Sequence, residues 1–398
     1  MSFTPNRNII RDKTGATVDV SRYGQITTAS RHDYILCRFE YNNSTYDVTT
    51  TTSGTGAASN SNSQAVASTG AGVGTCVFST AKLIAYRPAH EVYGYMSAVF
   101  SAGVADTTQR VGIFDTNDGF YFGFSGANFG IGIRNSAVDT FVNSSAWNKD
   151  KCDGTGTSGF VLDPTKYNQY KITYGWLGIA PITFWVYGGE SLGWIICHVH
   201  DKTNSQTVPT IQSPCLRMQW EVRRTSGSGA VTLAIGCVAG GALSGAHSHA
   251  GHRVFSATSG PKTLTASTET MLLAIRSETT FQSLTNKICS DVMLIAGSTD
   301  GTKNVRINVY ENASITAGAW SSIDSTNSVM SKNTTMTGFT GGTTSLVIPM
   351  LKTDTLLFDT GVGHIHLDIC PGENLLITGY STSANDVEFS LTWEEYFA

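Results

Sequence analysis

The chain has 398 residues, enough for two or three domains of ordinary size, and only 14% of them are charged. Its formal net charge of −4 leaves no basic surface that could displace counterions, so we expect no binding to nucleic acid. No run reaches the roughly 18 apolar residues of a membrane span, and the N-terminal segment has no apolar signal core. We therefore expect neither a membrane segment nor secretion by the ordinary route.

Residues 1–75 are expected to form an extended N-terminal arm that ends in a linker. The stretch 49–75 is rich in Ser, Thr and Gly and has few apolar side chains that could stabilise an ordered backbone. We expect this linker to become ordered only against a neighbouring subunit.

Short strands dominate the prediction for residues 76–255. The segments 170–174, 182–187 and 230–237 are rich in β-branched and aromatic residues and are bounded by turn-forming residues, and no segment shows a helical apolar stripe over three turns. A polar stretch rich in Gly and His follows at 240–253. We place a domain boundary near residue 255, at its end.

Residues 256–398 show the clearest period-two alternation in the chain. In 387–393, Val387, Phe389, Leu391 and Trp393 alternate with polar residues, and 304–310 follow the same pattern. Such alternation is typical of half-buried antiparallel strands. The sequence predicts an all-β protein with two antiparallel β-sandwich or jelly-roll-like domains preceded by an extended N-terminal arm.

The loop WNKDKCDGTGTSG, residues 147–159, holds two acidic residues close to several glycines. Lysines occupy positions where an EF-hand needs oxygen ligands, so the loop is no EF-hand. We expect Trp147, Asp150, Asp153 and Gly154 to form a structural turn, with the indole as an anchor and a glycine at positive φ. An ion held by Asp150 and Asp153 is the alternative.

Six of the nine histidines fall in H-x-H pairs, at 198/200, 247/249 and 364/366. On a strand, a spacing of two puts both rings on one face, about 7 Å apart at the backbone, where they could offer a metal two nitrogens. The alternative is an amphipathic side chain on an outer strand face or at a subunit contact. We commit to no metal site; the candidate ligands are His364, His366, Asp368, His198 and His200, together with Asp150 and Asp153.

The eight cysteines are widely scattered and contain no C-x-x-C pair. We expect them to be small buried hydrophobic residues in a reducing compartment.

Enzyme signatures of the common hydrolase and nucleotide-binding types are absent from the sequence, so we expect no enzyme, no catalytic residue and no cofactor. A pair of carboxylates could still serve a glycosidase. The candidates for such a pair are Asp150, Asp153, Asp163, Glu394 and Glu395.

The segments 86–100, 110–134, 147–189, 198–204 and 213–225 resemble, in this order, a module of tailed-bacteriophage virion structural proteins. The matching positions are Trp147, Asn148, Asp150, Asp153, Gly154, Leu162, Asp163, Lys166, Trp176, Leu177 and Gly178. A final strand ending in SLTWEE looks like a second module of the same proteins. Ala180 and Pro181 depart from the usual pattern of this module.

The resemblance implies a structural component of a bacteriophage or similar large DNA virus, giving assembly contacts and surface display as a head decoration or fibre, neck or baseplate protein. It implies a virion location after assembly in the host cytoplasm, with other virion proteins and further copies of this chain, such as a trimer, as partners. The alternative is a receptor-binding or carbohydrate-binding adhesin that contacts a host surface glycan through Tyr121, Trp185 and Trp194. A glycan depolymerase is the third hypothesis.

Overall fold

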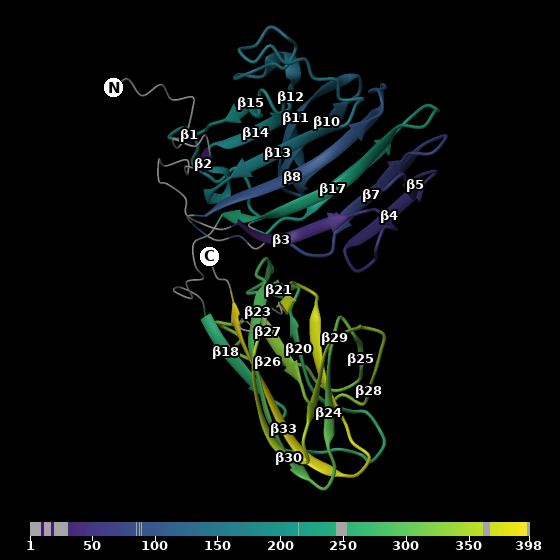
Figure 1. The fold of residues 1–398 in the computed structure, drawn as a ribbon, viewed down its shortest axis with the longest axis vertical. Helices are drawn as coiled ribbons and strands as arrows, with labels where there is room; N and C mark the ends of the chain where they lie inside the picture. Colours follow the sequence, from purple (N-terminus) through teal and green to yellow (C-terminus); the bar gives the residue numbers. More distant parts are fainter. Residues whose placement is uncertain are drawn as a thin grey trace. The chain divides into compact units, whose positions relative to one another are not determined.

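The computed structural model describes residues 9–11, 17–19, 31–84, 86, 88, 90–213, 215–243, 253–360 and 367–395. Over these residues the chain consists of β-strands and two short 3-10 helices, which confirms the predicted all-β fold. None of the described helices is long and apolar enough to cross a membrane. The chain divides into two compact units, residues 1–248 and 249–398, coloured purple to teal and green to yellow in Figure 1.

The first unit contains two antiparallel sheets. The seven-stranded sheet has the order β12 (Val138–Asn143), β11 (Asn128–Asn135), β10 (Gly119–Ser125), β9 (Thr107–Phe114), β16 (Met218–Arg224), β7 (Gly74–Thr80) and β4 (Val48–Gly54). The eight-stranded sheet has the order β15 (Trp194–His200), β14 (Ile182–Tyr187), β13 (Asn168–Tyr174), β8 (Glu91–Phe100), β17 (Thr232–Leu243), β6 (Gln64–Ser68) and β5 (Ala57–Ser61), and β3 (Arg31–Arg38) also pairs with β17. The remaining elements are the pair β1 (Ile9–Arg11) and β2 (Thr17–Asp19) and the 3-10 helices η1 (Ser144–Ala146) and η2 (Trp176–Gly178).

The two sheets enclose one hydrophobic core. Alternate residues of each strand point into it, so Phe122 of β10 meets Phe184 of β14 edge to face, with ring centroids 5.5 Å apart. Within the seven-stranded sheet, Trp220 of β16 stacks on its cross-strand neighbour Phe78 of β7, with ring centroids 5.0 Å apart. The first unit is therefore a β-sandwich.

Residues 49–75 form strands of the first unit, which corrects the expectation of a linker. Strand β4 pairs with β7, and β5 and β6 form a hairpin whose second strand pairs with β17. Few apolar side chains suffice here, because the neighbouring strands supply the backbone hydrogen bonds and Ala65 and Ala67 fill the inward positions.

The second unit also contains two antiparallel sheets of six strands each. The first has the order β18 (Arg253–Thr258), β33 (Asn385–Glu395), β23 (Ser290–Gly301) and β30 (Thr353–Asp359), with β19 (Lys262–Thr263) on β33 and β31 (Asp368–Ile369) on β23. The second has the order β26 (Ser321–Ser322), β27 (Met330–Asn333), β20 (Thr270–Ser277), β32 (Asn374–Tyr380), β24 (Val305–Glu311) and β29 (Thr343–Met350). Two small hairpins pair β21 (Thr280–Phe281) with β22 (Leu284–Thr285) and β25 (Ser314–Thr316) with β28 (Gly338–Thr340).

The alternation noted in the sequence is confirmed in β33. Its four apolar side chains, Val387, Phe389, Leu391 and Trp393, are all buried in the core of the second unit. The domain boundary expected near residue 255 falls inside β18, which pairs with β33 over its whole length. The division between the units therefore precedes β18.

Cys289 and Cys370 form a disulfide, so the expectation of unpaired cysteines is wrong for these two. They are 81 positions apart in the sequence, but the pairing of Ser290 with Ile369 between β23 and β31 brings their backbones together. The other six are free thiols; Cys37, Cys76, Cys152 and Cys197 are buried, Cys215 is half-buried and Cys237 is exposed.

Candidate functional site

The face of the eight-stranded sheet that points away from the core carries a row of large side chains. Lys171 of β13 lies directly across from Trp185 of β14 on one side and from Tyr95 of β8 on the other. Strand alternation explains this placement, because neighbours such as Ile172 and Phe184 are fully buried in the core. Lys171, Trp185 and Tyr95 are half-buried on the outer face.

A second row of rings continues this face. Trp194 of β15 lies across from Tyr187 of β14, with ring centroids 5.4 Å apart, and its ring is also 5.5 Å from that of Tyr95. Tyr93, two residues earlier on β8, lies 5.5 Å from Tyr95. Tyr93 itself is only 2% exposed and supports Tyr95 from the side. We call the half-buried set the aromatic platform; it consists of Tyr95, Lys171, Trp185, Tyr187 and Trp194.

Lys171 lies at the centre of the aromatic platform. Its Nζ is 4.0 Å from the ring centroid of Trp185, 5.0 Å from that of Trp194 and 5.7 Å from that of Tyr95. An ammonium group is attracted to the negative face of an aromatic ring, and the aliphatic stem of lysine adds apolar contact. The platform therefore combines flat apolar surfaces with one positive charge held between them.

Sequence reasoning found only part of this platform. It singled out Trp185 and Trp194, which the structure brings together, but it missed Lys171, Tyr95 and Tyr187. The alternation in 170–174 and 182–187 was a usable signal, because it puts lysine and aromatic residues at outward positions. The sequence does not contain the register that sets these strands side by side.

Tyr121, the third glycan candidate, is not available for stacking, because only 2% of its surface is exposed. It lies on the outer face of the seven-stranded sheet, beneath the guanidinium of Arg110 at 4.9 Å from the ring centroid. The close approach depends on a glycine across from it, since a Cβ at Gly132 would lie 2.0 Å from the tyrosine ring. Tyr121 is a structural residue.

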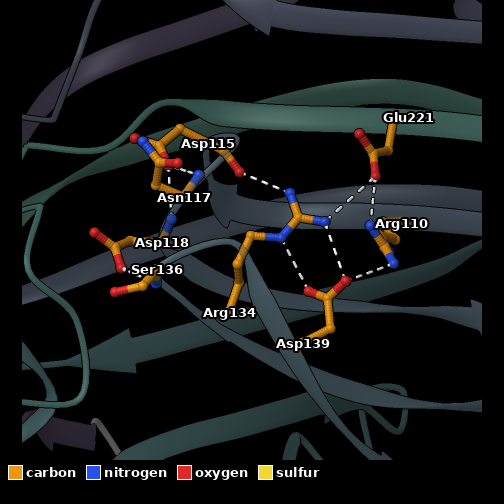
Figure 2. A network of polar contacts seen from close by, with 8 residues as sticks. All are labelled: Arg110, Asp115, Asn117, Asp118, Arg134, Ser136, Asp139 and Glu221. Carbon is orange, nitrogen blue, oxygen red and sulfur yellow. Dashed lines mark hydrogen bonds and ion pairs between the residues drawn. The ribbon is translucent and has the colours of Figure 1, made fainter.

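Figure 2 shows the polar network around this position. Arg110 donates to Glu221 Oε1 and to Asp139 Oδ2, both at 2.8 Å, and Arg134 Nε donates to Asp139 Oδ1 at 2.9 Å. Burial acts to raise the pKa of Asp139, but the hydrogen bond from Arg134 and the charge of Arg110 outweigh it and lower the pKa. Two cations and two carboxylates thus neutralise each other, which fits a stabilising role better than a catalytic one.

The loop at 147–159 is held by its own hydrogen bonds. Asp150, 5% exposed, accepts from the backbone N–H of Cys152 at 2.9 Å and of Ser158 at 2.8 Å. Asp153 accepts from the backbone and hydroxyl of Thr155, which lower its pKa. The two carboxylates thus accept hydrogen bonds from different turns of the loop.

Trp147 and Asn148 attach this loop to the sandwich. The indole is buried and meets Phe122 and Phe129 edge to face, each with ring centroids 6.3 Å away. The Asn148 side chain donates to the carbonyl of Val199 at 2.8 Å and accepts from its N–H at 2.9 Å, as a neighbouring strand would. Further along the loop Gly154 has φ +86°, a left-handed conformation suited to glycine.

His198 and His200 lie at the end of β15. His198 Nδ1 accepts from the backbone N–H of Asn148 at 3.4 Å, and burial lowers the pKa of His198 to about 4. Burial also lowers the pKa of His200. Both rings are therefore mainly neutral at pH 7, and His198 contributes to the attachment of the loop.

The described residues contain no group of three or more His, Cys, Asp or Glu side chains that could hold a metal ion. His364 and His366 lie outside the described residues, as do His247 and His249. Asp368 is part of β31, directly across from Asp291 of β23.

The carboxylates considered for a glycosidase pair have structural partners. Glu395 Oε1 accepts from Ser328 Oγ at 2.5 Å and from Trp393 Nε1 at 3.0 Å, and burial raises the pKa of Glu395. Asp163 caps a turn by accepting from the N–H and hydroxyl of Thr165. Asp163 lies in the first unit and Glu395 in the second, so the two carboxylates are not a catalytic pair inside a single unit.

No family model and no curated protein matches this chain. Among solved structures, it is similar to the Emp47p carbohydrate recognition domain, with 11% identity over 53% of this chain and 95% of that one at a TM-score of 0.34. A β-glucanase of Bacillus licheniformis matches with 11% identity over 52% of this chain and 98% of that one at a TM-score of 0.34. The binding domain of botulinum neurotoxin serotype D/C matches with 10% identity, 52% of this chain and 48% of that one, at a TM-score of 0.33, so the match spans about half of that domain. Likenesses at this level carry no argument about what the chain binds.

Proposed function

We propose that this chain is a binding protein whose first unit holds a glycan on the aromatic platform. The observation that carries the proposal is the set of adjacent half-buried rings on one sheet face, above all Trp194 against Tyr187 and Tyr95. A sugar ring has an apolar face of C–H groups that stacks on flat aromatic surfaces, while its hydroxyls remain hydrated. The role is binding without catalysis.

Binding at one platform is expected to be weak. A few stacked rings bury a small area, and the free energy gained from these contacts must exceed the entropy that the sugar loses on binding. We therefore expect a dissociation constant on the order of 1 mM at a single site. Several copies in a homo-oligomer would raise the apparent affinity through simultaneous contacts. This makes assembly of several chains part of the proposal.

The test is a glycan array probed with the full chain, followed by calorimetric titration of the bound sugars. Trp194→Ala should abolish measurable binding, because it removes the ring that joins both rows of the platform. The matched control is Trp320→Ala in the second unit, a half-buried tryptophan that also lies under a cation, with Arg276 4.3 Å from its ring centroid. Equal binding by wild type and Trp194→Ala would exclude the platform as the site.

A place in a virus particle is the second candidate function. It is supported by the resemblance to virion structural modules at positions such as Trp147, Asp150 and Gly154 and in the final SLTWEE segment. We propose that the chain is displayed on the virion after assembly in the host cytoplasm and contacts further copies of itself. Mass spectrometry and immunogold labelling of purified particles test this; absence of the chain from particles that contain the other virion proteins would contradict it.

A further inference from the structure

The loop that begins at Trp147 covers the outer edge of β15, the terminal strand of the eight-stranded sheet. The carbonyl of Cys197 accepts from the backbone N–H of Lys149 at 3.1 Å and from that of Asp150 at 3.2 Å. Asn148 continues this attachment through its side-chain hydrogen bonds with the next strand residue but one. An uncovered edge strand can pair with another chain, so the loop protects this edge.

The loop also brings a second thiol to this strand. Cys152 follows Asp150 closely in the loop, and its thiol lies in hydrogen-bond contact with the thiol of Cys197. Both cysteines are free, and both are buried in the core of the first unit, 3% and 0% exposed. A disulfide requires two thiols that face each other at short range, and this loop and strand provide them.

The second unit already contains a disulfide, between Cys289 and Cys370. Disulfides form and persist in oxidising environments, and one environment acts on both units of a single chain. We infer that Cys152 and Cys197 form a second disulfide under oxidation, which fastens the loop covalently to the edge of β15. This inference is independent of the proposed glycan binding.

The bond forms before the loop docks on β15. Burial raises the pKa of Cys197, and the thiolate is the nucleophile in disulfide exchange, so the docked thiols react slowly. With oxidised glutathione as the oxidant, the Cys152 thiolate attacks one glutathione sulfur and releases one glutathione thiolate. The Cys197 thiolate then attacks the mixed disulfide at Cys152 and releases the second. Two cysteine thiols thus lose two electrons and two protons, and one glutathione disulfide becomes two glutathione thiols.

The test refolds the full chain in a buffer of oxidised and reduced glutathione, with refolding in dithiothreitol as the reduced reference. Peptide mapping without reduction should find one pair of peptides joined through Cys152 and Cys197 after refolding with glutathione, and none after refolding with dithiothreitol. This measurement needs no variant.

Calorimetry measures whether the bond stabilises the first unit. It uses the double variant Cys289→Ser with Cys370→Ser, so that dithiothreitol has no bridge to reduce in the second unit. The link between Cys152 and Cys197 should raise the melting temperature of the first unit by at least about 5 °C, because a link across about 45 positions restricts the unfolded chain.

Further variants in the same background separate the link from the loss of a buried side chain. Cys152→Ala should have the same melting temperature in both buffers, since Cys197 then has no thiol to bond with in the loop. Cys76→Ala is the matched control and should keep the increase in glutathione, because this buried cysteine of β7 belongs to the same core but not to the link.

Two results would overturn the inference. In the first, Cys152 and Cys197 of the refolded chain remain free thiols or each carry glutathione. In the second, the linked chain melts no higher than the reduced chain, which would mean that the bond does not fasten the native loop.

Discussion

At the scale of single residues, the loop at 147–159 depends on one large side chain. Trp147 is 3% exposed, and its indole fills the space beside Phe122 and Phe129. Its Nε1 has no hydrogen-bond partner among the described residues, so the indole contributes by packing alone. The carboxylate of Asp153, in contrast, accepts hydrogen bonds from Thr155 within its own exposed turn.

Trp147→Ala should lower the free energy of unfolding by about 3–5 kcal/mol, because it leaves a large cavity in the core. Trp147→Phe should cost less, because the phenyl ring fills part of this cavity and the indole N–H has no hydrogen-bond partner among the described residues to lose. Urea denaturation followed by circular dichroism measures both, with Asp153→Asn as the control for a change in the same loop. If Trp147→Ala lowered the free energy of unfolding no more than Asp153→Asn does, the indole would not be an anchor of the loop.

His198 should make stability depend on pH in a defined window. Its folded pKa of about 4 lies below the ordinary value of 6.5, so the unfolded chain binds the proton more tightly. The stability that His198 contributes is complete above pH 6.5 and is lost as the pH falls from 6.5 toward 4. Unfolding free energies of wild type and His198→Gln, measured from pH 7.5 to 5, should show a shallower decline in the variant. Parallel curves would contradict this role.

At the scale of elements, the sequence predicted those strands whose own residues alternate between apolar and polar side chains. β33 was predicted because Phe389 and Leu391 alternate with polar residues, and a half-buried strand needs no more than that. Residues 49–75 were missed because their order comes from β7 and β17, and β17 is distant in the sequence. The aromatic platform was predicted only in part for the same reason. Alternation along β14 predicts that Trp185 points outward, but the pairing register between β13 and β14 is what places it beside Lys171.

A substitution at Gly56 tests whether residues 49–75, which the sequence predicted to be a linker, are an integral part of the sandwich. A Cβ at this position would lie 2.0 Å from the carbonyl oxygen of Thr75, a backbone atom that cannot move aside cheaply. Gly56→Ala should therefore destabilise the first unit by about 1–3 kcal/mol. Gly72→Ala is the matched control, since its Cβ would meet only the Thr55 side chain at 3.5 Å. Limited proteolysis should cut residues 49–75 faster in Gly56→Ala than in Gly72→Ala. Equal resistance of the two variants would show that the backbone around Gly56 accommodates the added Cβ without loss of stability.

At the scale of the whole molecule, the chain has two units with separate hydrophobic cores. Phe122 and Trp220 belong to the core of the first unit, and Phe389 and Trp393 to that of the second. The described disulfide, Cys289 to Cys370, lies entirely within the second unit. Each unit therefore has its own source of stability, and the two are expected to unfold as separate cooperative transitions.

The disulfide allows these transitions to be assigned. Cross-linking positions 81 residues apart restricts the unfolded second unit, and loss of such a link typically costs about 2–5 kcal/mol. The double variant Cys289→Ser with Cys370→Ser should lower one calorimetric transition and leave the other unchanged, because the first unit contains no atom of the bridge. Trp147→Ala supplies the reciprocal control, since it should lower only the transition that the double variant leaves in place. A single transition that shifts in both variants would show that the two units unfold as one.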